Sequence, residues 1–248
     1  FAKSESHDTY DEESVGGSLN LVYYKTDQLT LSGGVFGAAS RTQDFFGTRE
    51  FISAGLEGDV LYDNRDNKLD PSKGIYAQFN AMPFYEWEYS NPEVRFEAEG
   101  RTYYSVDSDK HTILAGRLKL GSVIGKGIPQ SNPGFLFTAG GGNSVRGYAY
   151  KSIGVTNAAG QETAGKSLLE SSFEVRQRLF GNFGAVGFID AGVVGPDSWV
   201  DFSEDVRVGV GGGVRYYTGL GPIRVDIAFP LNKTSGDPDF ALYAGIGQ

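Results

Sequence analysis

Residues 135–150 of this chain read FLFTAGGGNSVRGYAY. The stretch carries one arginine, Arg146, which follows a run of glycines and directly precedes Gly147 and Tyr148. A glycine-rich stretch alone is a weak signal, because glycine serves any tight turn or close backbone approach. The meaning of Arg146 therefore depends on the strand-like sequence on either side of it.

The composition suits a β-rich chain that forms one large domain. Its 248 residues include 36 Gly, 17 Phe and 14 Tyr, so glycine and aromatic residues exceed their usual share. No run approaches the roughly 18 consecutive apolar residues that a membrane-spanning helix requires, which excludes a helical membrane protein. Alternating strands can still cross a bilayer, because only one face of each strand needs to be apolar.

Charge and residue types exclude several kinds of site. The formal net charge of −9 disfavours binding to nucleic acid, or to anionic lipid through a diffuse basic surface. The absence of cysteine excludes disulfides and thiolate metal sites. His7 and His111 each stand apart from any second histidine, so we expect solvated or pore-facing side chains there. Since the chain begins at Phe1, without Met or a signal peptide, we expect a processed or excised piece.

Apolar and polar residues alternate along most of the chain. The clearest example is 223–229, where Ile, Val, Ile and Phe alternate with Arg224, Asp226 and Ala228. Alternation alone fits a soluble sandwich as well as a barrel. Soluble strands usually run about five or six residues, whereas the patterned segments here run roughly ten to sixteen, as tilted membrane strands do. The pattern favours an all-β fold, a transmembrane antiparallel β-barrel with a charged, wet lumen.

We expect about twelve strands in a single barrel domain over residues 1–248. Their ranges are 1–11, 16–25, 28–40, 50–62, 73–83, 92–105, 110–122, 166–180, 183–194, 204–218, 221–230 and 239–248. The first range is the weakest, since it has few apolar residues. An even count places short turns on the periplasmic side and makes 122–165 the dominant extracellular loop, which we expect to fold into the lumen. A loop of that length in a compact domain usually signals function or disorder, and the Val-Arg-Gly-Tyr stretch within it favours function.

Part of this loop is similar to a known family signature. Its residues Val145, Arg146, Gly147 and Tyr148 resemble the Val-Arg-Gly-Tyr/Phe motif of one superfamily of bacterial outer-membrane proteins. That superfamily contains the barrel-assembly, translocation-assembly and two-partner-secretion proteins. The translocation-assembly barrel is the member that the chain resembles most.

A second motif follows in the expected order. In AVGFIDAGVV, at 185–194, alternation places Phe188, Asp190 and Gly192 on one face of a strand. This stretch resembles the Phe-x-Asp-x-Gly strand of the family, and the resemblance implies that Asp190 meets Arg146 in the lumen. Such an arginine needs a carboxylate to offset its desolvation. Candidate second partners are Glu170 and Glu174. The alternative is an arginine exposed at a loop tip and an aspartate that lines a pore.

Two further segments match the family pattern. DNRDNKLDPSKG, at 63–74, has the acidic spacing of a calcium loop, but Arg65 and Lys68 lie in its middle and no glutamate closes the ligand set. It more closely resembles the periplasmic Asp-x-Arg-Asp turn of the family, with a structural role. The C-terminal residues resemble the last strand of outer-membrane barrels, although the usual terminal aromatic residue is absent. The outward positions of this strand, at one side of a lateral seam, are Phe240, Leu242, Ala244 and Ile246.

The sequence contains no Gly-x-Ser-x-Gly, His-Glu-x-x-His or Walker motif, so we expect no enzyme, catalytic residue, cofactor or metal. The resemblance implies a barrel in the bacterial outer membrane that assists insertion or translocation of other outer-membrane or secreted proteins. The alternative is a two-partner-secretion pore or a passive diffusion channel. Implied partners are the lipid bilayer, unfolded client proteins and periplasmic or inner-membrane assembly proteins, but no nucleic acid.

The strand count departs from the family pattern. The family barrel has sixteen strands and follows polypeptide-transport-associated repeats, whereas this chain has about twelve strands and no such repeats. Either four strands are missing from the N-terminal side, or this is a smaller natural barrel. We favour a part of a larger family barrel. Pairing of residues 1–11 or 16–25 with 240–248 would establish closure with twelve strands.

Overall fold

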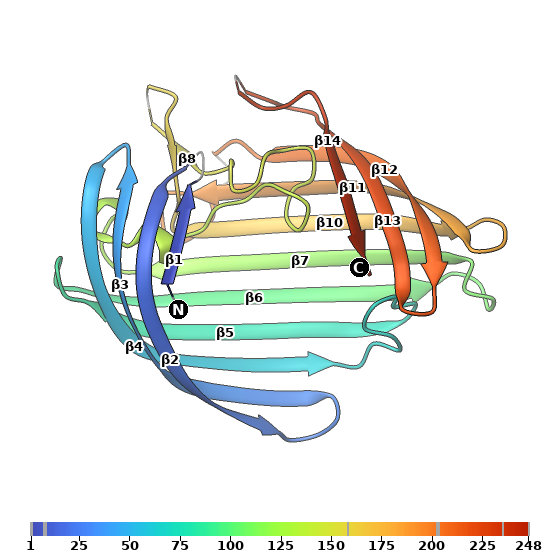
Figure 1. The fold of residues 1–248 in the computed structure, drawn as a ribbon, viewed down its shortest axis with the longest axis horizontal. Coiled ribbons are helices and arrows are strands. Elements are labelled where there is room, and N and C mark those ends of the chain that lie inside the picture. The colour runs from blue at the N-terminus through green and yellow to red at the C-terminus, as the bar shows by residue number, and fades with distance from the viewer. Residues whose placement is uncertain (1, 7–8, 158, 202–203, 235, 248) are drawn as a thin grey trace.

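The computed structural model describes residues 2–6, 9–157, 159–201, 204–234 and 236–247. In these ranges, twelve strands form one antiparallel sheet, and each strand pairs with the next one along it (Figure 1). The strands are β1 (Ala2–Ser6), β2 (Asp11–Tyr24), β3 (Leu29–Asp44), β4 (Gly47–Asp63), β5 (Gly74–Glu86), β6 (Asn91–Ser105), β7 (Thr112–Ile124), β10 (Ser167–Arg178), β11 (Phe183–Gly195), β12 (Arg207–Thr218), β13 (Gly221–Pro230) and β14 (Ala241–Ile246).

The segment between β7 and β10 has its own short elements. They are the hairpin of β8 (Val155–Thr156) and β9 (Glu162–Thr163), which the sequence analysis missed, and the 3₁₀ turns η1 (Ile128–Gln130) and η2 (Pro133–Phe135). No helix in the described ranges is long and apolar enough to cross a membrane.

The expected all-β fold and its twelve strands are confirmed, but the N-terminal bounds are wrong. The first strand ends at Ser6, where Ser6 pairs with Asp11, and β2 begins at Asp11 instead of residue 16. The chain turns here because Thr9 and Tyr10 are buried and Tyr10 packs against the long loop. His7 lies outside the described residues, and His111 is exposed in the turn between β6 and β7.

Two neighbouring strands are also longer than expected. β3 continues to Asp44 and β4 begins at Gly47, so a tight turn replaces the loop expected at 41–49. Gly47 adopts a φ of 95°, which favours glycine, and the Asp44 carboxylate accepts a hydrogen bond from the Phe46 N–H at 2.9 Å.

Alternation separates a lipid-facing surface from a charged lumenal surface. On β13, Val225 is 47% exposed, whereas its neighbour Asp226 is 1% exposed. On β10, Phe173 and Val175 face outward, while Arg176 is buried on the lumenal side. The facing predicted from the apolar alternation at 223–229 is therefore confirmed on β13, and β10 follows the same pattern.

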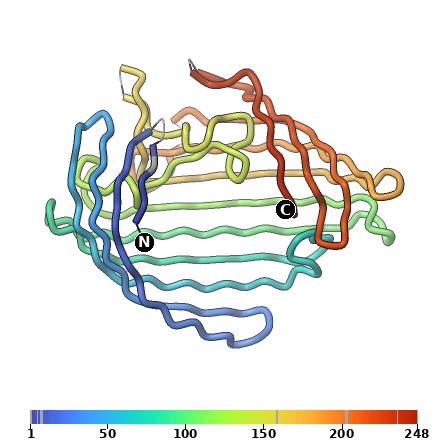
Figure 2. Tube along the Cα trace, viewed as in Figure 1, coloured from blue at the N-terminus to red at the C-terminus, as the bar shows by residue number. Residues whose placement is uncertain are grey.

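The sheet curls into a barrel that its backbone does not close. β1 pairs with β2, β14 pairs with β13, and no ladder in the described ranges joins β1 to β14. Figures 1 and 2 show these two strands as the edges of the curled sheet, with a gap between them. The described residues thus lack the pairing that would establish closure with twelve strands.

The long loop packs on the concave side of the sheet (Figure 2). Its backbone forms bridges between Phe137 and Gly165 and between Ala139 and Ile153. Its apolar residues meet lumenal residues of three strands and of the first turn in one buried cluster. The cluster contains Tyr10, Val123, Ile128, Leu136, Phe137, Ala139, Val145, Tyr148, Ile153, Ala164, Leu168 and Val194.

The turn between β4 and β5 lies at the opposite end of the barrel. Within it, Asp66 accepts hydrogen bonds from the N–H and the hydroxyl of Ser72 at 2.9 and 2.5 Å. Leu69 extends toward the C-terminal strands, since a Cβ built on Gly221 or Gly247 would lie 3.2 or 3.3 Å from its side chain. Asp70 forms an ion pair of 2.7 Å with Arg178 of β10. The turn between β4 and β5 therefore contacts β10 and the ends of β13 and β14 at this mouth of the barrel.

Candidate functional site

The glycine-rich part of the loop forms a compact turn that presents Arg146. Gly140 and Gly141 have φ angles of 103° and 100°, a region in which other residues are strained. The Ser144 hydroxyl accepts a hydrogen bond from the Gly140 N–H at 2.9 Å, and the Gly141 N–H donates to the Val145 carbonyl at 3.2 Å. These bonds fix the backbone immediately before Arg146.

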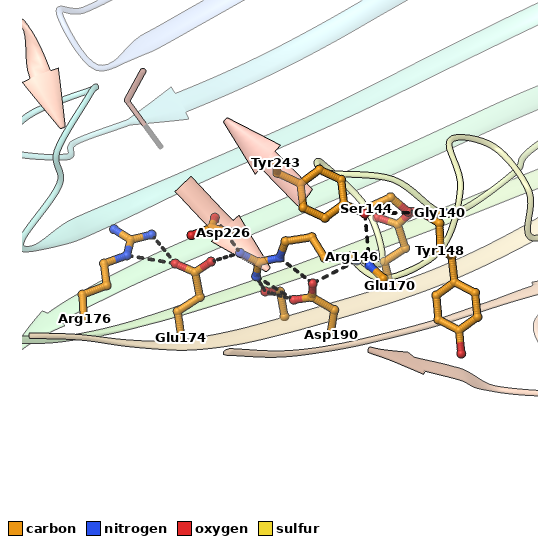
Figure 3. A network of polar contacts seen from close by, with 12 residues as sticks. Gly140, Ser144, Arg146, Tyr148, Glu170, Glu174, Arg176, Asp190, Asp226 and Tyr243 are labelled. Atoms are coloured by element: carbon orange, nitrogen blue, oxygen red, sulfur yellow. Dashed lines mark hydrogen bonds and ion pairs between the residues drawn. The ribbon is translucent and has the colours of Figure 1, made fainter. Parts of the chain in front are cut away.

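Arg146 is buried among carboxylates on the lumenal wall (Figure 3). Its Nε and Nη2 donate to the two carboxylate oxygens of Asp190 at 2.7 and 2.9 Å, and its backbone N–H donates to the same carboxylate at 3.1 Å. Its Nη1 lies 2.7 Å from Glu174 Oε1. A cation held by two buried carboxylates has its desolvation largely offset.

Phe188 of β11 covers the face of the guanidinium group. The Arg146 Cζ lies 3.4 Å from the centroid of the Phe188 ring, in a cation–π geometry. The ring in turn lies over Gly211 of β12, where a Cβ would approach Phe188 Cζ to 2.4 Å. The structure thus brings Phe188 and Asp190 of the second motif to the same arginine.

Glycines in the wall allow the loop to approach this closely. A Cβ on Gly192 of β11 would lie 2.6 Å from Val145 Cγ2. A Cβ on Gly209 of β12 would lie 1.8 Å from the carbonyl oxygen of Arg146, which is a severe clash. Gly192 belongs to the second sequence motif, whereas sequence analysis did not single out Gly209.

Gly147 and Tyr148 attach the loop to the last three strands. Gly147 has a φ of 103°, and a Cβ there would lie 2.9 Å from the backbone at the end of β13. The Tyr148 hydroxyl donates to the Val208 carbonyl at 3.2 Å and contacts the Asn232 side-chain oxygen at 2.8 Å. Burial raises the pKa of the Tyr148 phenol, which keeps this hydroxyl protonated.

The second candidate partners of Arg146 differ in their contacts. Glu174 links Arg146 to Arg176, whose Nε and Nη2 each lie 2.9 Å from its Oε2. Glu170 instead accepts a hydrogen bond from Ser144 of the loop and forms an ion pair of 2.8 Å with Arg117. Glu170 therefore supports the glycine-rich turn, while Glu174 contacts the arginine itself (Figure 3).

Tyr243 of β14 is a site residue that sequence reasoning missed. Its hydroxyl accepts a hydrogen bond from the Gly147 N–H at 3.0 Å and donates to the Tyr148 carbonyl at 3.3 Å. The signal available in the sequence was an aromatic residue at an inward position, between the outward residues Leu242 and Ala244.

The outward residues of β14 face away from the loop. Phe240, which precedes the strand, Leu242 and Ile246 are exposed large apolar side chains, and Ala244 is exposed between them. They continue the lipid-facing surface up to the unpaired edge of the sheet. Beside the arginine, on the lumenal side, a cavity of about 400 Å³ is lined by charged side chains, Arg101 and Arg224 among them.

In the described ranges, no group of three or more His, Cys, Asp or Glu side chains could hold a metal ion. Arg146 pairs with Asp190 and Glu174, and Glu174 pairs with Arg176, where the loop meets the wall of the barrel.

Solved structures contain the same fold. BamA from Haemophilus ducreyi, in a crystal structure lacking POTRA domains 1–3, matches with a TM-score of 0.79 and 17% identity, over 97% of this chain and 56% of that chain. CdiB from Acinetobacter baumannii has a TM-score of 0.61, 14% identity and coverages of 94% and 42%. CdiB from Escherichia coli has a TM-score of 0.60, 15% identity and coverages of 95% and 45%. The chain thus spans about half the length of these proteins.

A family model described as the Omp85 superfamily domain matches residues 2–248. The match confirms the resemblance found in the Val-Arg-Gly-Tyr stretch and the expected location in the bacterial outer membrane. This chain is therefore a member of the Omp85 superfamily.

Proposed function

We propose that this barrel assists the insertion or translocation of other outer-membrane or secreted proteins. Membership of the Omp85 superfamily and the likeness in fold to BamA and CdiB support this proposal. The barrel would act without a chemical step, so it would not be an enzyme. Its partners would be the lipid bilayer, unfolded client proteins and periplasmic or inner-membrane assembly proteins. The translocation-assembly subfamily stays a prediction.

The observation that carries the proposal is the pair of unpaired strand edges, β1 and β14. Each is paired on one side in the described residues, and at five and six residues they are shorter than the other strands of the sheet. An unpaired edge presents a row of N–H and C=O groups that can pair with an added strand. A client strand would form its first hydrogen bonds there, next to lipid.

The position of the loop also supports the proposed function in insertion or translocation. Arg146, Asp190 and Glu174 hold the loop in the lumen, where it reduces the space open to ions and polypeptides. A lateral route between β1 and β14 would not carry the client through the space that this loop fills. A route through the lumen would require the arginine to leave both carboxylates.

An insertion assay with the 248-residue chain, in which β1 and β14 are the two edges of the sheet, tests the proposal. The protein is reconstituted in liposomes, and an unfolded barrel protein is added as the client. Folding of the client is followed by its protection from protease and by its altered mobility in unheated gels. We expect faster client folding than in empty liposomes.

Cross-linking then tests the role of the edges, which is practical because the chain has no native cysteine. Ser4→Cys and Ala244→Cys are bridged by bismaleimides of graded length, and bridging should abolish the gain in client folding. The matched control bridges Val214→Cys to Val225→Cys, which are paired residues of β12 and β13 and do not span the gap.

Unchanged insertion after bridging of β1 to β14 would contradict the lateral route. Steady ion conduction in planar bilayers without any gain in client folding would support the alternative, a secretion pore or diffusion channel. A mostly closed conductance together with client folding is the result expected from a loop-filled lumen.

A further inference from the structure

The side chain of Tyr243 attaches the last described strand, β14, to the loop on the lumenal side. β14 forms a ladder of six residue pairs with β13, and its other edge is unpaired in the described residues. Tyr243 points inward from the middle of this ladder and binds the backbone of Gly147 and Tyr148 through its hydroxyl. Its ring also covers Gly142, where a Cβ would lie 2.8 Å from Tyr243 Cδ1.

The same loop is bound to strands on the other side of the gap. Arg49 of β4 donates to the carbonyls of Ile128 and Pro129 at 3.2 and 2.7 Å. Ser40 of β3 accepts a hydrogen bond from the Asn132 side chain at 2.8 Å. The loop therefore reaches from the N-terminal strands to β14, across the gap that no backbone ladder closes.

We propose that Tyr243 is a positioning residue that ties the last strand to the docked loop, so that release of the loop frees the edge of β14. Arg146 holds the loop on β10 and β11, and the hydrogen bonds of the Tyr243 hydroxyl to this loop restrict the movement of β14. The role of a freed edge in accepting a client rests on the proposed function. The tie itself is a property of the barrel alone.

The hydrogen bonds of the Tyr243 hydroxyl can be removed without removing the apolar contacts of its ring. The Tyr243 ring packs against Val186, Phe188 and Ala228, so Tyr243→Phe keeps the apolar contacts and removes the hydroxyl. The Arg146 contacts with Asp190 and Glu174 do not involve Tyr243 and should remain. Tyr217→Phe is the matched control, since Tyr217 lies on the lumenal face of β12 and packs against Arg178, at the end of the barrel away from the loop.

Amide hydrogen exchange of the full-length protein in liposomes, without any client, tests the tie. In Tyr243→Phe, we expect roughly two- to twelve-fold faster exchange of the Gly147 amide and the β14 amides, as the loss of one hydrogen bond predicts. The Arg146 amide, which is bonded to Asp190, should exchange at the wild-type rate. Tyr217→Phe should leave β14 unchanged.

A double variant tests whether Tyr243 stabilises β14 through the docked loop or only through its local contacts. If Tyr243 acts through the loop, Tyr243→Phe should add nothing to the exchange of β14 once Arg146→Ala has released the loop. If Arg146→Ala fails to assemble, Arg146→Lys replaces it, because lysine keeps the charge and loses the two-pronged contact. Equal increases in both backgrounds, or no increase in the single variant, would overturn the proposal.

The client assay is run separately on the same variants. Coupled exchange without client folding would refute the proposed function and leave the tie intact. Client folding without coupled exchange would refute the tie and leave the proposed function intact.

Discussion

Arg146 and Asp190 are joined at three points: the backbone N–H, Nε and Nη2 of the arginine all donate to the one carboxylate. The side-chain bonds fix the plane of the guanidinium group, and the backbone bond fixes the loop that carries it. The carboxylate is fully buried on β11, so neither group can exchange its partner for water while the loop is docked. The pair therefore specifies one position of the loop along the wall.

Arg146→Ala should destabilise the barrel by about 3–5 kcal/mol, because it leaves the Asp190 carboxylate buried without its cation. Arg176→Ala should cost less, since Glu174 would keep Arg146 as a partner. Urea unfolding and limited proteolysis of residues 136–150 measure both effects. Equal losses of stability in the two variants would show that the pairing of Arg146 with Asp190 contributes no more than the pairing of Arg176 with Glu174.

Gly209→Ala should displace the loop without touching any charged group. The added methyl would lie 1.8 Å from the Arg146 carbonyl oxygen, so we expect a cost of at least about 1–3 kcal/mol from overpacking. Gly187→Ala on β11 is the control, because a Cβ there meets nothing within 4 Å. Thermal unfolding in detergent compares the two, and a similar midpoint for both would argue against close loop packing.

Cysteine labelling should distinguish the two faces of β13. Val225→Cys faces lipid and should resist a water-soluble maleimide in liposomes, whereas Arg224→Cys borders the lumenal cavity and should react. Asp226 is a poor probe of the lumen, because it is buried in an ion pair with Arg215. Labelling of Val225→Cys in preference to Arg224→Cys would contradict the register.

The stability of the turn at 63–74 should fall at acid pH, where the Asp66 carboxylate becomes protonated. Burial acts to raise the pKa of this carboxyl, but hydrogen bonds from Ser72, Lys110 and Lys73 outweigh it and lower the pKa below its ordinary value. The stabilisation is therefore present above the unfolded-state pKa of about 3.9 and is lost as pH falls toward the folded-state value.

Asp66→Asn tests this dependence by proteolysis of the turn across a pH series. The variant should be cleaved faster than the wild type at neutral pH, and the difference should shrink below about pH 4. The matched control is Asp27→Asn, an exposed residue in the turn between β2 and β3, which should leave cleavage of the turn at 63–74 unchanged at every pH. If the difference in cleavage rate between Asp66→Asn and the wild type were the same at every pH, protonation of Asp66 could not be its cause.

The strands could be predicted because alternation is a local property of the sequence, as residues 223–229 illustrate. The N-terminal bounds could not, since the polar start offers no apolar periodicity and the turn is set by burial of Tyr10 against a distant loop. The meeting of Arg146 and Asp190 was implied by family resemblance and not by spacing. Tyr243 and Gly209 escaped notice because their partners lie far away in the chain, where no local pattern reports on contact.

The turn between β4 and β5 adds a side-chain contact across one mouth of the open sheet. Leu69 lies against Gly221 and Gly247, so apolar contacts join this turn to the ends of β13 and β14, which no backbone ladder joins to it. Apolar contacts have no preferred direction and can adjust by sliding, whereas a hydrogen-bonded ladder would have to break. Separation of β1 from β14 would therefore break no ladder among the described strands.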